Sequence, residues 1–164
     1  MSNDVYLGNP LLKKANTPIE FTEEQVIEFV KCSQDPVYFA KNYVQIVTLD
    51  KGLQPFRLYD FQEKLVNRFH ENRFNICKMP RQTGKSTTVV SFLLHYAVFN
   101  DNVNIGILAN KAATARELLD RLQTAYENLP KWMQQGIISW NKGSLELENG
   151  SKILAASTSA SAVR

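Results

Sequence analysis

The stretch Met79-Pro80-Arg81-Gln82-Thr83-Gly84-Lys85-Ser86 decides how this chain is interpreted. Its last three residues end a phosphate-binding loop of the form G-x-x-x-x-G-K-[ST]. Glycine lets successive backbone N–H groups turn toward phosphate oxygens, and lysine reaches the β- and γ-phosphates. The serine hydroxyl can coordinate Mg²⁺, and the following helix offers its N-terminus to the anion. The first glycine position of the pattern holds Met79, so a strict pattern search misses this loop.

The surroundings of the loop support the motif. Residues 74–79 predict a short strand, and residues 87–99 predict a mostly buried helix. Strand, loop and helix in this order are the context that the motif requires. Nucleotide binding, with ATP and Mg²⁺ as the bound groups, is therefore the leading hypothesis.

Length and composition bound the possibilities. A chain of 164 residues with 44% hydrophobic and 21% charged residues is typical of one globular domain. The net charge of +3 permits contact with nucleic acid but does not indicate it. Cys32 and Cys77 have no metal-ligand spacing and lie in apolar surroundings, so we expect buried free thiols in a reducing cytoplasm. No apolar run reaches membrane-spanning length, and we expect no membrane partner.

Three regions follow from the pattern along the chain. Residues 1–20 predict a flexible arm, 21–55 an N-terminal helical region, and 56–164 a P-loop ATPase domain. Thr22 and Gln25 form a capping box that begins one helix, and Asp35-Pro36 begins the next. The first of these helices is expected to bury Val26, Ile27, Phe29 and Val30, residues 52–55 predict a loop, and residues 59–69 predict a further helix.

Strands and helices alternate after the loop. Residues 103–109 predict a buried strand, residues 111–128 a helix, and residues 145–155 a hairpin around a type I′ turn at Asn149-Gly150. We therefore expect an α/β fold with a P-loop NTPase core of the RecA-like (ASCE) kind. Its parallel sheet would carry helices on both faces, and the small helical region would precede it.

An acidic residue for Mg²⁺ is missing from this pattern. Such a residue normally follows an apolar strand. Asp101 falls in a turn and Asp120 within a helix, while Glu146 and Glu148 alternate with leucines and are expected to face solvent. We expect the core to be incomplete, ending before the Walker B strand that would supply this acid.

The run from Phe21 to Arg164 resembles the N-terminal ATPase domain of the large terminase subunit of T-even-like tailed bacteriophages. The fourth of the segments that carry the resemblance is long and unusual, which makes the match specific. The segments are Leu58-Tyr59-Asp60-Phe61-Gln62, Pro80 to Ser86, Gly106-Ile107-Leu108-Ala109-Asn110-Lys111 continuing to Leu119-Asp120-Arg121, and Gly136 to Ser151.

The resemblance implies a motor subunit that couples ATP hydrolysis to translocation of viral DNA into a procapsid. It also implies a C-terminal nuclease domain, which has no counterpart in these 164 residues. The implied partners are double-stranded viral DNA, the portal protein and the small terminase subunit. The protein would form a homo-oligomeric ring at the portal, in the host cytoplasm and docked only transiently on the procapsid, and it would be absent from the mature virion.

Residue roles follow by matching the segments. Lys85 and Arg81 take catalytic roles, with Arg81 acting on the γ-phosphate of its own subunit. Gln62 takes the role of an adenine reader, and Arg57 flanks the base. Ser86 binds the metal ion. The remaining nucleotide-binding residues are Gln82, Thr83, Gly84 and Thr87.

Two other readings stay open. A helicase-like DNA-dependent ATPase shares the glutamine and the phosphate loop, and a nucleotide-binding fragment without turnover needs only the loop. His70 and His95 lack partners at ligand spacing and are interpreted as packing or surface residues. Trp132 and Trp140 are interpreted as anchors of the domain rather than as DNA-stacking residues.

Overall fold

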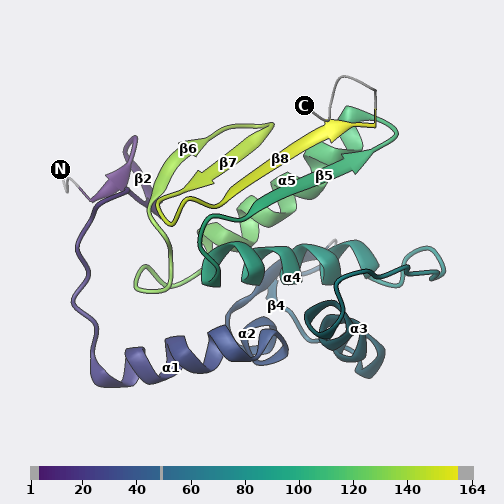
Figure 1. The fold of residues 1–164 in the computed structure, drawn as a ribbon, viewed down its shortest axis with the longest axis horizontal. Coiled ribbons are helices and arrows are strands. Elements are labelled where there is room, and N and C mark those ends of the chain that lie inside the picture. Colours follow the sequence, from purple (N-terminus) through teal and green to yellow (C-terminus); the bar gives the residue numbers. More distant parts are fainter. Residues whose placement is uncertain (1–3, 49, 159–164) are drawn as a thin grey trace.

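A mixed sheet and a group of helices make up the fold of the computed structural model, which describes residues 4–48 and 50–158 (Figure 1). The helices are α1 (Glu23–Gln34), α2 (Pro36–Tyr43), α3 (Asp60–Glu71), α4 (Lys85–Phe99) and α5 (Ala112–Glu127). The strands are β1 (Val5–Tyr6), β2 (Asn9–Lys13), β3 (Gln45–Thr48), β4 (Gly52–Pro55), β5 (Asn104–Ala109), β6 (Ile137–Trp140), β7 (Ser144–Leu147) and β8 (Lys152–Ser157). No helix in the described ranges is both long and apolar enough to cross a bilayer.

The main sheet has four strands in the order β5-β8-β7-β6. Only β5 and β8 are parallel, while β7 pairs antiparallel with both β8 and β6. The expectation of a parallel sheet is therefore wrong for most of this sheet. The physical reason is connection length: short turns can join only antiparallel neighbours, whereas a helical crossover separates β5 from the strands that follow it.

One face of this sheet is covered and the other is open. Along β8, Ile153 and Ala155 are buried whereas Lys152 and Leu154 are exposed. Helix α5 packs against β5 and β8 on the buried side. Such alternation is typical of a sheet with one solvated face, so the expectation of helices on both faces is wrong within the described residues.

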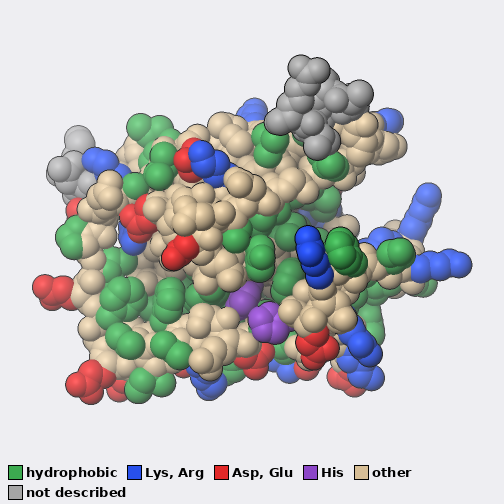
Figure 2. All heavy atoms as spheres, in the orientation of Figure 1, with side chains coloured by type: hydrophobic (Ala, Val, Ile, Leu, Met, Phe, Trp, Pro, Cys, Tyr) green, Lys and Arg blue, Asp and Glu red, His purple; other side chains and the backbone are tan. Residues whose placement is uncertain are grey.

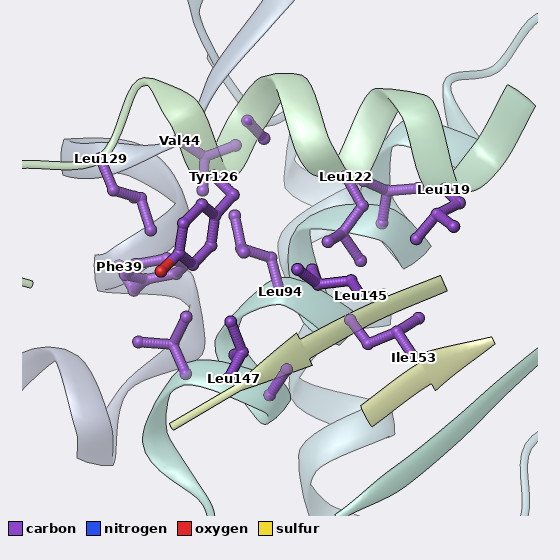
Figure 3. Close-up of a cluster of buried hydrophobic side chains, with 14 of the residues drawn as sticks. Phe39, Val44, Leu94, Leu119, Leu122, Tyr126, Leu129, Leu145, Leu147 and Ile153 are labelled. Carbon is purple, nitrogen blue, oxygen red and sulfur yellow. The ribbon is translucent and has the colours of Figure 1, made fainter. Parts of the chain in front are cut away.

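The buried side chains of several elements meet in one core (Figure 3). Phe39 of α2, Leu94 of α4 and Tyr126 of α5 pack together there with side chains of β7 and β8. The Tyr126 hydroxyl donates a hydrogen bond to the carbonyl of Gln135. The helical region 21–55 and the region 56–164 therefore share one core in this structure.

Helix starts agree with the capping residues in the sequence. Thr22 and Gln25 form the predicted capping box of α1, and the Asp35 carboxylate accepts hydrogen bonds from the backbone N–H groups of Val37 and Tyr38 at the start of α2. The expected buried face of α1 is wrong for three of its four residues, however. Helix α1 packs through Phe29 and Cys32, whereas an exposed patch contains Val26, Ile27 and Val30 (Figure 2).

The N-terminal segment is docked rather than free. Strands β1 and β2 form a small antiparallel hairpin, and Leu12 is buried. The buried Gln134 side chain accepts a hydrogen bond from the backbone N–H of Lys13 and donates to the carbonyl of Leu11. The described part of the region 1–20 is thus held by side-chain to backbone bonds, which a flexible-arm prediction from composition does not anticipate.

Glu148 holds this hairpin to the sheet, so its expected solvent-facing position is wrong. The Lys13 ammonium lies 2.9 Å from its carboxylate, which also accepts hydrogen bonds from the N–H groups of Gly136 and Asn16. Burial alone would raise the pKa of Glu148, but these donors together hold the pKa below its ordinary value. Residue 148 lies beyond the end of β7, so strand alternation does not apply to it.

Strands β7 and β8 confirm the predicted hairpin, with a different turn. Leu147 and Ser151 pair across three loop residues, and Gly150 adopts a φ of 81°. A type I′ turn also needs a positive φ at the preceding residue, and Asn149 does not have one. The connection is therefore of the three-residue kind that places glycine in the left-handed position.

Residues 74–79 form no strand, which corrects the expected strand before the phosphate loop. Phe74 and Ile76 are strongly exposed, and Cys77, which was expected to be buried, is exposed as well. A strand needs a hydrogen-bonded neighbour, and within the described residues no strand pairs with this segment. Among the described strands, β5 likewise pairs with β8 alone, and Ile107 is its one buried residue.

The segment 45–55 forms the antiparallel hairpin β3–β4 in place of the expected loop over residues 52–55. Gly52 supplies a φ of 65° where β4 begins. This hairpin lies near α5 and contributes to the hollows described below.

Candidate nucleotide-binding site

The loop between α3 and α4 curls tightly before the start of α4. Gln82 and Gly84 both adopt left-handed backbone conformations, with φ values of 60° and 71°. A Cβ atom at Gly84 would lie 2.5 Å from Nε2 of Gln62. Glycine is therefore favoured at this position by its backbone angle, and its lack of a Cβ atom also leaves room for the Gln62 amide.

The Lys85 side chain folds back into the loop. Its Nζ donates hydrogen bonds to the carbonyls of Met79 and Pro80, at 3.2 Å and 3.0 Å. The Thr83 hydroxyl donates to the same Pro80 carbonyl. The ammonium group thus lies within the curl of the loop, beside the N-terminus of α4, which is where an anionic oxygen would gain most.

A hollow of about 280 Å³ opens over this loop and is strongly basic. None of the residues that line the hollow is acidic. They are Arg81, Gln82, Thr83, Gly84, Lys85, Ser86, Thr87 and Arg121.

A second, larger hollow of about 750 Å³ adjoins the first. It shares Gln82, Thr83, Gly84 and Thr87 with the basic hollow, so the two spaces meet at the loop. Its other walls come from the β3–β4 hairpin and the start of α3, where the exposed Tyr59 stacks on Phe61. Arg57 and Gln62 also line it. The structure thus brings every candidate site residue from the sequence to one of two adjoining hollows.

Gln62 connects α3 to the loop. Its amide oxygen accepts a hydrogen bond from the Tyr59 backbone N–H, and its amide nitrogen donates to the Thr83 carbonyl at 3.3 Å. The side chain is buried, with 3% exposure. Gln62 therefore supports the loop in addition to lining the larger hollow, a role that the sequence did not suggest.

The oxygen ligands that Mg²⁺ prefers are incomplete here. Ser86 lines the basic hollow, but no carboxylate does. Asp120 and Glu117 lie on α5 and line a neighbouring hollow of about 680 Å³ between α4, α5 and β3, which shares Thr87 and Arg121 with the basic hollow. In the described ranges no group of three or more His, Cys, Asp or Glu side chains could hold a metal ion.

Two contributions to the site have no counterpart in the motif. Arg121 of α5 reaches the basic hollow, and the β3–β4 hairpin forms one wall of the larger hollow. The hairpin has a weak sequence signal in the short apolar run before Gly52. Arg121 has none, because its place depends on how α5 packs against α4.

The histidines and tryptophans lie outside the two hollows at the loop. His95 is buried between α1 and α4, and His70 is exposed on α3. Trp132 and Trp140 pack edge-on or tilted against Tyr43 and Tyr126 at the margin of the core. Their positions agree with packing and anchoring roles.

The fold and the loop define an α/β chain with a basic, tightly curled loop at a helix N-terminus. The family described as "Terminase large subunit, T4likevirus-type, N-terminal" matches residues 76–164, and the chain belongs to this family. The matched residues include the loop before α4, the main sheet and α5.

A solved structure shares the fold. The crystal structure of the HK97 bacteriophage large terminase superposes with a TM-score of 0.62 at 20% sequence identity. The match covers 78% of this chain and 28% of the HK97 chain. This chain therefore corresponds to less than a third of that protein, and the likeness concerns the fold alone.

Proposed function

We propose that this chain is the ATP-binding part of a viral DNA-packaging motor. The motor couples ATP hydrolysis to the translocation of double-stranded genomic DNA into a procapsid. Membership of the large terminase family supports this proposal, and one observation on the molecule carries it. Lys85 lies inside the curl of a glycine-turned loop, at a helix N-terminus, in a hollow lined by cations and no acids.

The residues of the two hollows have different proposed roles, which follow from their chemistry. Lys85 and the loop backbone bind the phosphate chain, and Ser86 supplies a hydroxyl ligand for Mg²⁺. Arg81 stabilises charge on the γ-phosphate, while Gln62 and Arg57 orient the adenine in the larger hollow. Bound ATP supplies the free energy of phosphoanhydride hydrolysis. In this arrangement the phosphates and the base occupy adjoining spaces that meet at Gly84.

The partners belong to the same proposal. They are double-stranded viral DNA, the portal protein and the small terminase subunit, with several copies of the protein arranged as a ring at the portal. The protein works in the host cytoplasm, docks transiently on the procapsid and cuts DNA through a nuclease domain of the intact protein. A second candidate is nucleotide binding without turnover, which is favoured by the lack of a carboxylate among the lining residues of the basic hollow.

Lys85→Ala tests the nucleotide site. Removing a charged hydrogen-bond donor from a phosphate site costs about 1.5–3 kcal/mol, so the affinity for Mg·ATP should fall by roughly tenfold to a hundredfold. Titration calorimetry measures this change. Lys64→Ala, which removes an exposed lysine of α3 outside both hollows, is the matched control and should leave the affinity unchanged. Equal affinities of the Lys85 variant and the unaltered protein would refute the site assignment.

A further inference from the structure

Arg121 is the one residue lining the basic hollow that comes from outside the loop and the start of α4. It lies on α5, which packs along α4, and its side chain reaches the space over Lys85 and Ser86. With Arg81 and Lys85 it makes three cations around a hollow that no acidic residue lines. A cluster of one sign of charge in a recess attracts a highly charged ion of the opposite sign.

The Arg121 guanidinium forms an ion pair with Glu117. One guanidinium nitrogen lies 2.6 Å from the Glu117 carboxylate, one helical turn away on α5. Glu117 lines the neighbouring hollow and not the basic one. Both side chains are about half exposed, at 49% for Arg121 and 61% for Glu117. An exposed pair of this kind contributes only about 0.2–1 kcal/mol, so a better anion can replace it.

The guanidinium suits a phosphate chain better than it suits this carboxylate. It carries five N–H donors, and the ion pair with Glu117 uses one of its terminal nitrogens. Phosphate oxygens accept two parallel N–H bonds from one guanidinium, which is stronger than a single contact. The energetic balance therefore favours transfer of Arg121 from Glu117 to a bound polyphosphate.

We propose that Arg121 is a third cationic ligand of the phosphate chain, held by Glu117 until a triphosphate enters the basic hollow. This inference rests on the proposed function and adds to it a residue of α5. The ligand class is a nucleoside triphosphate, or any polyphosphate that presents the same oxygens. Binding then joins α5 to the loop through one ion contact.

Titration with Mg·ATP and with inorganic tripolyphosphate tests the proposal. Arg121→Gln removes the charge and keeps most of the side-chain length, and it should weaken both ligands by about tenfold. The matched control is Arg116→Gln, an exposed arginine on the same helix that does not line the hollow. Its effect should stay within about twofold, since a distant surface charge is screened by salt.

Glu117→Gln supplies a change in the opposite direction. It frees the guanidinium, so both ligands should bind a few-fold more tightly. In the Arg121→Gln background the same substitution should have no effect, because the residue that it frees is gone. Both positions are exposed on α5, and thermal unfolding verifies that the variants stay folded.

Three results would overturn the role of Arg121. These are equal losses in the Arg121 and Arg116 variants, an equal gain from Glu117→Gln with and without Arg121, and no binding of tripolyphosphate at all. Lys85→Ala separates this failure from a failure of the proposed function. If Lys85→Ala weakens binding while Arg121→Gln does not, only the role of Arg121 is wrong. If neither variant weakens binding of Mg·ATP, the nucleotide site itself is wrong.

Discussion

Single residues at the loop combine structural support with contact to the proposed ligand. Glycine is favoured at position 84 because its φ of 71° lies in the left-handed region, and a Cβ atom there would also displace the Gln62 amide. Gln62 in turn bonds to the backbone at Tyr59 and Thr83. The loop is thus fixed by a side chain that lies 22 residues before Gly84 in the sequence. Such support matters because phosphate binding depends on the placement of backbone N–H groups.

The adenine-reading role of Gln62 is tested by comparing two nucleotides. Gln62→Ala should weaken both nucleotides through loss of the loop support, and it should weaken ATP by roughly tenfold more than GTP, because only adenine presents the N6 and N7 pattern that an amide can pair with. Competition binding with the two Mg·nucleotides measures the difference. Gln54→Ala is the control, since Gln54 lines the same hollow but bonds to the β3–β4 segment. A similar loss for ATP and GTP would reduce Gln62 to a support of the loop.

At the scale of elements, contacts between helices hold the loop-bearing helix α4 in place. His95 of α4 lies with its Nε2 atom 2.9 Å from the Cys32 carbonyl of α1. Phe39 of α2 and Phe99 of α4 surround the ring, and His70 of α3 lies 6.4 Å away by ring centroids. Helices α1, α2 and α3 therefore all meet α4 around one histidine, far from the phosphate end of the helix.

The burial of His95 makes the stability of the fold depend on pH. Burial lowers the pKa of His95 from 6.5 to about 4. The unfolded chain therefore binds a proton more readily than the folded one between these values, and stability falls as the pH falls from 6.5 to 4. At one pKa unit per 1.4 kcal/mol, the loss amounts to about 3 kcal/mol. Above pH 6.5 His95 is neutral in both the folded and the unfolded chain, so it no longer makes the free energy of unfolding depend on pH.

Urea unfolding at a series of pH values measures the effect of His95→Gln. The variant should lack most of the decline in the free energy of unfolding between pH 6.5 and 4, whatever its stability at neutral pH. His70→Gln is the comparison, because His70 is exposed and its charge is a lesser cause of the lowered pKa of His95 than burial, so its replacement should keep most of the decline. A decline of the same size in both variants would assign the acid sensitivity to other groups.

At the scale of the whole molecule, the described part of the main sheet has an unpaired edge at β5 and one exposed face. Strand β5 pairs with β8 on one side, and no described strand pairs with its other edge. A hollow of about 770 Å³ separates Asn104 and Ile105 from residues 69–77 and α4. On the open face of the sheet, Leu108, Ile138 and Leu154 are about half exposed. An unpaired edge next to exposed apolar side chains is a template for association with another chain.

The 164-residue chain should therefore self-associate at micromolar concentration. Leu108→Lys, which places a charge on β5, should shift the population toward monomer, because a lysine at an edge opposes pairing with a second strand. Leu7→Lys is the control, with the same change of charge at an exposed position in the N-terminal hairpin. Sedimentation velocity over a range of concentrations distinguishes the species. A monodisperse monomer for the unaltered chain would contradict the expectation.

Features that depend on neighbouring residues alone could be predicted from the sequence. The capping residues at Thr22 and Asp35 begin helices where expected, and the glycine before the helix at Lys85 turns the loop. The hairpin around Gly150 is also confirmed, because its alternation and its turn are local. The family was recognisable for the same reason, since its motifs are contiguous segments of the chain. The residues named from the motif and the resemblance line two adjoining hollows, and their roles remain predictions.

Only the tertiary structure decided which surfaces are covered and which distant residues meet. The apolar pattern predicted that α1 buries one face and that residues 74–79 form a strand. Both predictions failed because burial and strand pairing require a partner that the local sequence does not specify. The docking of the N-terminal hairpin through Gln134 and Glu148 depends on contacts more than 100 residues apart in the chain. Arg121 reaches the basic hollow for the same reason: the packing of α5 on α4, rather than any motif, places its charge over the phosphate loop.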